Sequence, residues 1–113
     1  MNSRQRLSIA GVLVLASAVV SALAWPDLPA ELVTHWNAAG EPEGTMSKAL
    51  GLSLVPVVTA STVLLFLLIP RIDPLGENIE AFRAEFDWFI VVFTGFMTLV
   101  HVGIVAFNLG YEF

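Results

Sequence analysis

The sequence predicts an all-α integral membrane protein with three transmembrane helices, a structured outer loop and a short amphipathic cytoplasmic helix. Of the 113 residues, 57% are hydrophobic and only 13% are charged, which is about half the charged fraction of soluble domains. Three apolar runs are each long enough to cross a hydrocarbon core of about 30 Å. We expect a single membrane domain, residues 1–113, with spans at about 7–25, 50–69 and 88–109, an outer loop at 26–49 and a cytoplasmic loop and helix at 70–87.

The first span runs from Leu7 to Trp25 and contains no charged residue. A secretory signal peptide is the alternative, because Arg4 and Arg6 precede the apolar run and small residues lie near its end. The run is longer than the apolar region of a typical signal peptide, and no good A-x-A site precedes a soluble mature protein. We therefore expect a retained helix.

The outer loop contains the longest polar stretch in the front half of the chain, "THWNAAGEPEGTMSK". Its "NAAG" and "EPEG" segments resemble successive turns, closed by Gly40 and Gly44, which can adopt positive φ. Residues 32–37 before these turns are predicted to be extended, with Trp36 directed toward the membrane surface. Alternation along an extended segment then places three side chains on the opposite side: Val33, His35 and Asn37.

The same loop is the candidate recognition site. We expect His35, Asn37 and Lys48 to supply polar contacts, while Gly40 and Gly44 set the backbone. A metal site would need more ligands than one histidine with neighbouring glutamates provides. A rigid loop held by its own hydrogen bonds, with a surface available for recognition, is the simpler interpretation.

The second span contains Pro56. Proline removes one backbone hydrogen bond from a helix and favours a kink. Nearby hydroxyl groups can satisfy the carbonyl that loses its donor, and the span offers Ser53, Thr59, Ser61 and Thr62.

The predicted cytoplasmic helix lies in "DPLGENIEAFRAEFDWF". Asp73-Pro74 is typical of a helix start. Five apolar residues recur at helical spacing and define one face: Leu75, Ile79, Phe82, Phe86 and Phe89. Two interpretations stay open, an interfacial helix leading into the third span and a docking surface for a cytoplasmic protein.

The third span carries a polar stripe on one helical face: Asp87, Thr94, Thr98, His101 and Asn108. Such a face avoids lipid, and an ionisable residue inside a span is a functional candidate. The alternative is that His101 stays neutral and hydrogen-bonds across the bundle, to Ser17, Ser21, Thr59 or Thr62. We expect no carboxylate at depth, which disfavours proton-coupled transport.

Arginine positions predict the orientation. Arg4 and Arg6 precede the first span, Arg71 and Arg83 lie between the second and third, and only Lys48 lies in the outer loop. The positive-inside rule then predicts a multi-pass cell-membrane protein whose N-terminus is cytoplasmic and whose C-terminus is outside.

Composition also disfavours several function classes. Acidic residues outnumber basic ones ten to five, so we expect no nucleic-acid partner. The chain has no cysteine, and no nucleophile is paired with a base in a familiar pattern. We expect neither an enzyme nor a metal or cofactor site.

Two strings resemble the SdpI family of bacterial and archaeal membrane proteins, whose N-terminal part is a domain of unknown function. "LPAELVTHWNAAGEPEGTMSKALGLSLVP" matches its loop signature at Pro29, His35, Trp36, Asn37, Gly40, Pro42, Gly44, Ser47 and Lys48. "PRIDPLGENIEAF" is similar to the segment after its second helix, at Pro70, Ile72, Asp73, Pro74, Glu77, Asn78 and Phe82.

The resemblance implies an immunity and signal-transduction protein, with an extracellular peptide and a cytoplasmic regulator as partners besides the lipid bilayer. Fuller members of the family continue into further spans, so this chain is expected to be either a natural short form or a fragment. A structural or accessory subunit of a larger membrane assembly is the alternative, and homo-oligomerisation stays open.

Overall fold

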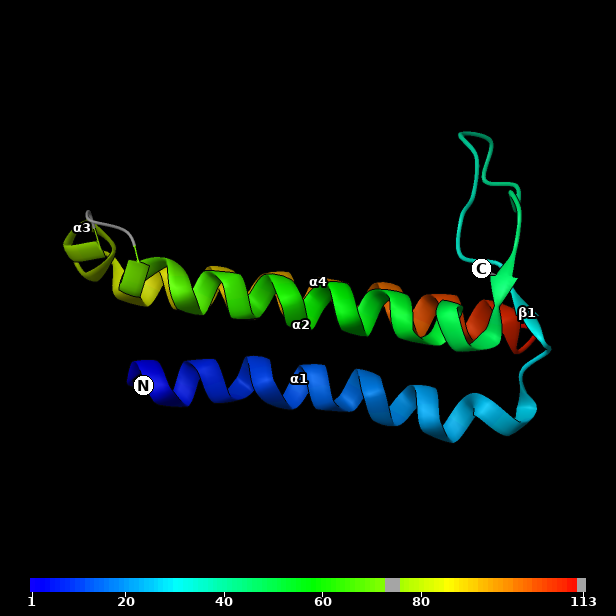
Figure 1. Ribbon diagram of the computed structural model, residues 1–113, viewed down its shortest axis with the longest axis horizontal. Helices are drawn as coiled ribbons and strands as arrows, with labels where there is room; N and C mark the ends of the chain where they lie inside the picture. The colour runs from blue at the N-terminus through cyan, green and yellow to red at the C-terminus, as the bar shows by residue number, and fades with distance from the viewer. Residues whose placement is uncertain (73–75, 112–113) are drawn as a thin grey trace.

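The protein is an elongated bundle of three long helices (Figure 1). This computed structural model describes residues 1–72 and 76–111. The long helices are α1 (Ser3–Ala24), α2 (Lys48–Ile72) and α4 (Arg83–Asn108), each long and apolar enough to span a membrane. The predicted fold class is therefore confirmed. The short elements are η1 (Trp25–Asp27), β1 (Glu31–Leu32), β2 (Met46–Ser47) and α3 (Gly76–Glu80).

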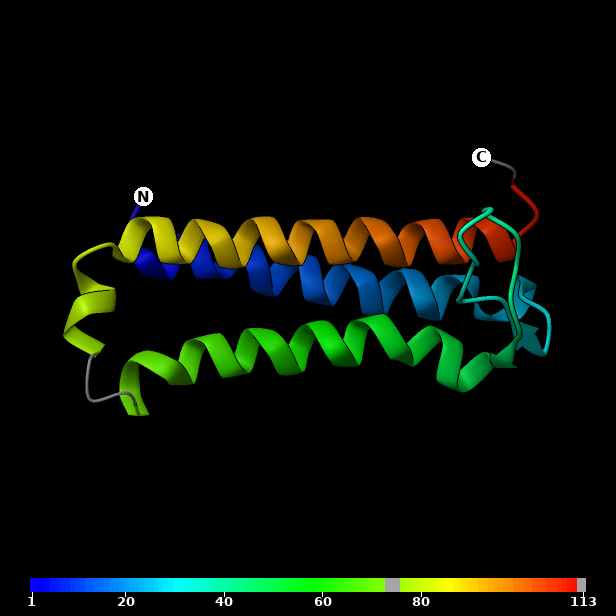
Figure 2. The ribbon, with the colours of Figure 1, turned by 90° about the horizontal axis from the view of Figure 1, so that it is seen from above.

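The three helices lie side by side, and α1 and α4 run in the same direction while α2 runs oppositely (Figure 2). The longest dimension of the bundle is 47 Å, close to the full thickness of a bilayer with its headgroups, about 40–45 Å. The end that holds the start of α1 and of α4 also holds α3. The loop between α1 and α2 projects from the opposite end (Figure 1).

Helix α1 starts before the predicted span because of a capping box at its N-terminus. The Asn2 side chain accepts from the Gln5 backbone N–H at 2.8 Å, and the Gln5 side chain accepts from the Asn2 backbone N–H at 2.9 Å. These bonds satisfy donors that a helix start leaves without partners. Arg6 consequently belongs to the helix and is buried.

Helix α2 continues through Pro56. The proline has no N–H to donate to the carbonyl of Leu52, four residues earlier. That carbonyl instead accepts from Ser21 Oγ of α1 at 3.0 Å. A hydroxyl therefore satisfies the freed carbonyl, as predicted, but it comes from α1 and not from α2. The nearest predicted donor in α2, Ser53 Oγ, instead donates to the Ala49 carbonyl.

The short helix predicted before the third span is present as α3, but its predicted continuation through Phe82, Phe86 and Phe89 is wrong. Helix α3 ends at Glu80, Phe82 has non-helical backbone angles (φ −129°, ψ 38°), and α4 begins at Arg83. The turn at residues 81–82 redirects the chain from the end of the bundle into it (Figure 2). Leu75 and the predicted start at Asp73-Pro74 lie outside the described residues.

The aromatic residues assigned to that helix take part in packing instead. Phe86 and Phe89 belong to α4, where they stack edge-to-face on Phe66 of α2 with ring centroids 6.3 and 5.6 Å apart. Phe93 joins the same cluster at 6.0 Å. The apolar spacing therefore reflects a helix face, but that face meets α2.

A small core closes the loop end of the bundle: Ala24, Leu28, Leu32, Leu52 and Val105. Leu32 is completely buried against Gly51. A Cβ atom at Gly51 would lie 2.9 Å from Leu32 Cδ1, so any other residue here would force the buried Leu32 side chain to shift. The base of the outer loop is thus packed into the bundle and not merely tethered to it.

Candidate functional site

The outer loop folds as an irregular β-hairpin. Strand β1 pairs with β2 antiparallel, with Glu31 opposite Ser47 and Leu32 opposite Met46. A further bridge joins Trp36 to Pro42. We call residues 31–47 the outer hairpin and residues 37–41 its tip.

The tip is a turn organised by Asn37. The side-chain oxygen of Asn37 accepts from the backbone N–H groups of Ala39 (2.9 Å) and Glu41 (3.0 Å), and the Gly40 N–H donates to the Asn37 carbonyl at 2.9 Å. The first predicted turn is therefore confirmed. The Asn37 side chain offers a ligand only its amide N–H groups, because its oxygen is already used by the turn.

The second predicted turn, "EPEG", is wrong. Pro42 lies in the returning limb opposite Trp36, and the Glu43 N–H donates to the His35 carbonyl at 3.0 Å. This cross-limb pairing satisfies backbone groups that a second turn would leave to solvent. Gly44 is instead a left-handed position within the limb, with φ +75°.

Both loop glycines have the positive φ predicted for them, +79° at Gly40 and +75° at Gly44. No heavy atom lies within 4 Å of the Cβ that either position would carry. The requirement for glycine therefore comes from the backbone conformation and not from crowding.

Side chains alternate along the first limb as predicted. Leu32 and Thr34 are buried, whereas His35 and Asn37 are exposed and Val33 is partly buried. His35 Nδ1 lies 2.9 Å from the Thr34 hydroxyl. The imidazole thus has one nitrogen paired within the hairpin while its ring faces outward.

Two contacts attach the hairpin to the end of α4. The Asn108 side chain brackets Val33, accepting from its N–H at 2.9 Å and donating to its carbonyl at 2.8 Å. The Trp36 ring packs edge-on against Phe107, with centroids 5.2 Å apart. The structure thus gives Trp36 an aromatic partner on α4, and its placement at the membrane surface stays a prediction.

Lys48 lies at the base of the hairpin, away from its tip. Its ammonium donates to the Trp25 carbonyl at 2.9 Å and lies 4.6 Å from the centroid of the Trp25 ring. Its backbone N–H donates to Ala30 at 2.8 Å. Three of the five predicted recognition residues lie together near the tip: His35, Asn37 and Gly40. Gly44 lies in the returning limb, and Lys48 connects the end of α1 to the start of α2.

Inside the bundle, His101 is fully buried. Its Nε2 lies 2.7 Å from Ser21 Oγ, one of the partners predicted for it. The Ser21 hydroxyl can donate to the Leu52 carbonyl freed by Pro56 while its oxygen accepts from His101 Nε2–H. His101 therefore links all three long helices through one hydroxyl. The second ring nitrogen, Nδ1, is buried without a hydrogen-bond partner among the described residues.

The other predicted intramembrane polar residues bond locally. Thr94 Oγ1 donates to the Ile90 carbonyl at 2.7 Å, and Thr98 Oγ1 donates to the Thr94 carbonyl at 2.8 Å. Thr98 also approaches the Leu13 carbonyl of α1 at 3.4 Å. These bonds let a polar stripe face α1 without leaving its hydroxyls unsatisfied.

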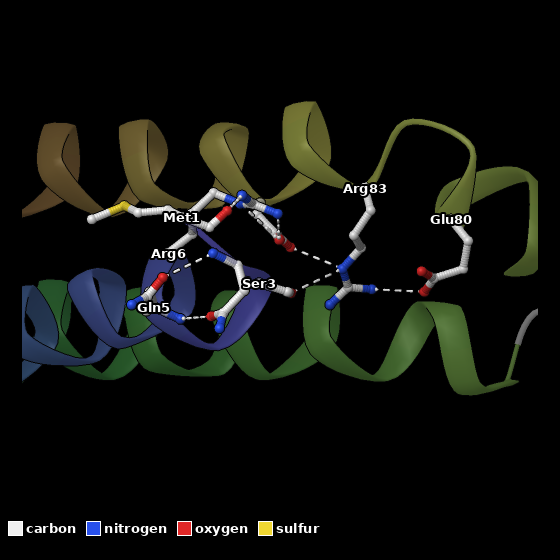
Figure 3. Close-up of polar contacts among 8 residues, drawn as sticks. Met1, Ser3, Gln5, Arg6, Glu80 and Arg83 are labelled. Carbon is white, nitrogen blue, oxygen red and sulfur yellow. Dashed lines mark hydrogen bonds and ion pairs between the residues drawn. The ribbon is translucent and has the colours of Figure 1, made fainter.

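The sequence prediction missed a charge cluster at the opposite end (Figure 3). Arg6 of α1 contacts Asp87 Oδ2 of α4 through Nε and Nη2, both at 3.1 Å, and Arg83 Nε lies 3.0 Å from Asp87 Oδ1. Asp87 is fully buried, but it lies one turn from the start of α4, at the end of the bundle. The expectation of no carboxylate at membrane depth therefore stays a prediction. The spacing of Arg83 and Asp87 signals a helical ion pair, but nothing local points to Arg6.

Across residues 1–72 and 76–111, no group of three or more His, Asp or Glu side chains is arranged to hold a metal ion.

Part of the chain matches a known sequence domain. Residues 12–60 match the family model described as "Domain of unknown function (DUF1648)". The match covers most of α1, the whole outer hairpin and the first half of α2. No curated protein and no solved structure matches the chain.

Proposed function

We propose that the protein is a membrane receptor or immunity protein of the SdpI type, and not an enzyme. In this proposal the outer hairpin meets an extracellular peptide, and the opposite end of the bundle engages a cytoplasmic regulator. The matched domain is often found in SdpI-like membrane proteins. That association, together with the loop signature, supports the assignment.

The observation that carries the proposal is the exposed, internally bonded tip of the hairpin. Asn37 fixes the turn through two side-chain hydrogen bonds, and His35 presents an exposed ring beside it. A preorganised loop loses little conformational entropy when a ligand binds. Binding residues are commonly carried by such loops on rigid scaffolds.

Helix α4 provides a physical connection between the two ends. Its C-terminal end holds the hairpin through Phe107 and Asn108, and its N-terminal end holds Asp87 in the charge cluster. Helix α3 precedes α4 directly. A ligand that displaced the hairpin would therefore act on the helix that continues to the candidate regulator-binding end.

The distribution of basic residues supports the proposed orientation. Arg4, Arg6, Arg71 and Arg83 belong to one end of the bundle, and Lys48 belongs to the other. The positive-inside rule assigns the arginine end to the cytoplasm. The hairpin is then outside, where a secreted peptide would reach it.

An accessory-subunit function is the second candidate, favoured by exposed small polar residues on α2. Ser53 and Ser61 lie on the surface of the isolated chain. Small polar residues on the surface of a transmembrane helix favour close packing against another helix. A second copy of the chain, or another membrane protein, would cover them.

Gene neighbourhood followed by a binding measurement tests the proposal. A neighbouring gene for a secreted peptide supplies the ligand, and the labelled peptide is titrated against the protein in nanodiscs. Saturable binding that is lost on replacing Gly40 with Val supports the receptor function. Absence of saturable binding, combined with copurification of a membrane complex, would favour the accessory subunit.

A further inference from the structure

A groove opens between α1 and α2 at the arginine end of the bundle. Its volume is about 600 Å³, within the range of about 300–1,000 Å³ that small-molecule sites occupy. The turn that joins α3 to α4 contributes Glu80 and Arg83 to its mouth. The groove therefore extends from the membrane-spanning part of the bundle to its end.

The wall of the groove is aliphatic. Leu7 of α1 faces Leu64 and Leu68 of α2 across it, and the two α2 leucines are largely exposed in the isolated chain. These side chains belong to helices that span the membrane, so the medium around them is lipid. An extended hydrocarbon chain matches this wall in polarity.

The mouth of the groove is basic. Of the described residues that line it, Arg71 in the last turn of α2 and Arg83 at the start of α4 are cationic, and Glu80 contributes one carboxylate. The nearby buried carboxylate of Asp87 is also paired with Arg6. The described lining thus carries a net positive charge where the aliphatic wall ends.

Arg83 is held in a fixed position at this mouth. Its guanidinium contacts Ser3 Oγ at 3.2 Å, Glu80 Oε1 at 3.3 Å and Asp87 Oδ1 at 3.0 Å (Figure 3). These contacts use Nε and Nη1 and fix the plane of the guanidinium, so that Nη2 can donate to a phosphate oxygen at the mouth. Arg71 contributes a second, exposed guanidinium.

We propose that this groove binds one anionic phospholipid, with its phosphate between Arg71 and Arg83 and an acyl chain along Leu7, Leu64 and Leu68. Basic pockets between transmembrane helices bind anionic headgroups in this manner. Arginine–phosphate hydrogen bonds are charge-assisted and stronger than neutral ones. The inference is independent of any peptide ligand at the outer hairpin.

The test uses native mass spectrometry of the purified full chain in detergent, titrated with phosphatidylglycerol or phosphatidylethanolamine. We expect wild type to retain phosphatidylglycerol preferentially. Arg71→Gln should weaken that retention roughly tenfold, the loss of one charge-assisted contact. Arg4→Gln is the matched control, because it removes the same charge at the same end from a residue outside the groove, and it should stay within about twofold of wild type.

A second variant tests the groove itself. Leu68→Trp fills the aliphatic wall without changing charge, and should reduce phosphatidylglycerol retention while the helical circular dichroism signal is unchanged. Equal losses for Arg71→Gln and Arg4→Gln, equal retention of the two lipids by wild type, or wild-type retention by Leu68→Trp would each overturn the proposal.

Discussion

Arg6 and Asp87 lie 81 positions apart in the chain, yet their side chains meet at 3.1 Å in a buried site. Asp87 also pairs with Arg83 one helical turn earlier in α4. Two cations therefore surround one carboxylate that has no exposed surface. The cluster joins the start of α1 to the start of α4.

Replacing Asp87 with Asn should destabilise the protein by about 3 kcal/mol, because two guanidiniums would lose their buried counter-charge. The measurement is the free energy of unfolding of purified protein in mixed micelles. Glu85→Gln is the control, since Glu85 is exposed in the same helical turn and single exposed charges contribute little. A Glu85→Gln loss as large as that of Asp87→Asn would contradict a special role for the cluster.

The orientation can be measured directly, because the chain has no cysteine. Thr45 in the outer hairpin and Asn78 in α3 are both exposed. Single-cysteine variants at these positions should react with an impermeant thiol reagent from opposite sides of the membrane, Thr45→Cys from outside intact cells. Labelling of both from one side would exclude three spans.

His101→Gln should preserve stability, because the Gln amide can still donate to Ser21 Oγ. His101→Leu should cost about 1 kcal/mol through the lost interhelical bond. Unfolding in mixed micelles measures both variants, and Ser21→Ala tests the same network from α1. Loss of a pH-dependent activity in a well-expressed His101→Gln variant would instead assign His101 a proton-transfer function.

Asn108 should control the attachment of the hairpin. In Asn108→Leu, the Val33 N–H loses its acceptor, and its hydrogen exchange should accelerate by about tenfold, equivalent to about 1.4 kcal/mol. Hydrogen exchange followed by mass spectrometry of residues 31–36 measures this. Unchanged exchange would mean that the Trp36–Phe107 contact is sufficient alone.

Some features of the fold followed from local sequence alone. The absence of charges placed the three spans, and the glycine positions placed the left-handed residues at Gly40 and Gly44. Alternation correctly separated His35 from Thr34, because a strand's two sides follow from adjacent residues. These features depend on neighbours in the chain.

Features that depend on distant partners could not be predicted in the same way. Alternation gave the side of Trp36 but not its partner Phe107, which is contributed by the last helix. The same holds for Arg6. Its position before the first span indicates membrane topology, but its ion pair with Asp87 depends on how α1 packs against α4. Ser21 illustrates an intermediate case. Its hydroxyl was a candidate partner for His101, but its bond to the Leu52 carbonyl, which Pro56 leaves without a donor, depends on how α2 packs against α1.

The outer hairpin should respond unequally to substitution at its tip. Asn37→Ala removes the acceptor for two backbone N–H groups, and Gly40→Val forces a β-branched residue to φ +79°. Each change should cost the turn about 1–2 kcal/mol. Glu43→Ala is the control, because its side chain is exposed and its backbone bond to His35 is retained.

The measurement is survival of a peptide-sensitive host expressing each variant, normalised to protein level in the membrane. We expect Asn37→Ala and Gly40→Val to lose most of the protection while Glu43→Ala retains it, because a disordered tip must be reordered at each binding event. His35→Ala distinguishes direct contact with the peptide from conformational order of the tip. It removes an outward-facing ring and leaves the backbone hydrogen bonds of the turn intact. Protection that is equal in all four variants would show that the hairpin is a passive connector, and would transfer the recognition function to the α3 end or favour the accessory subunit.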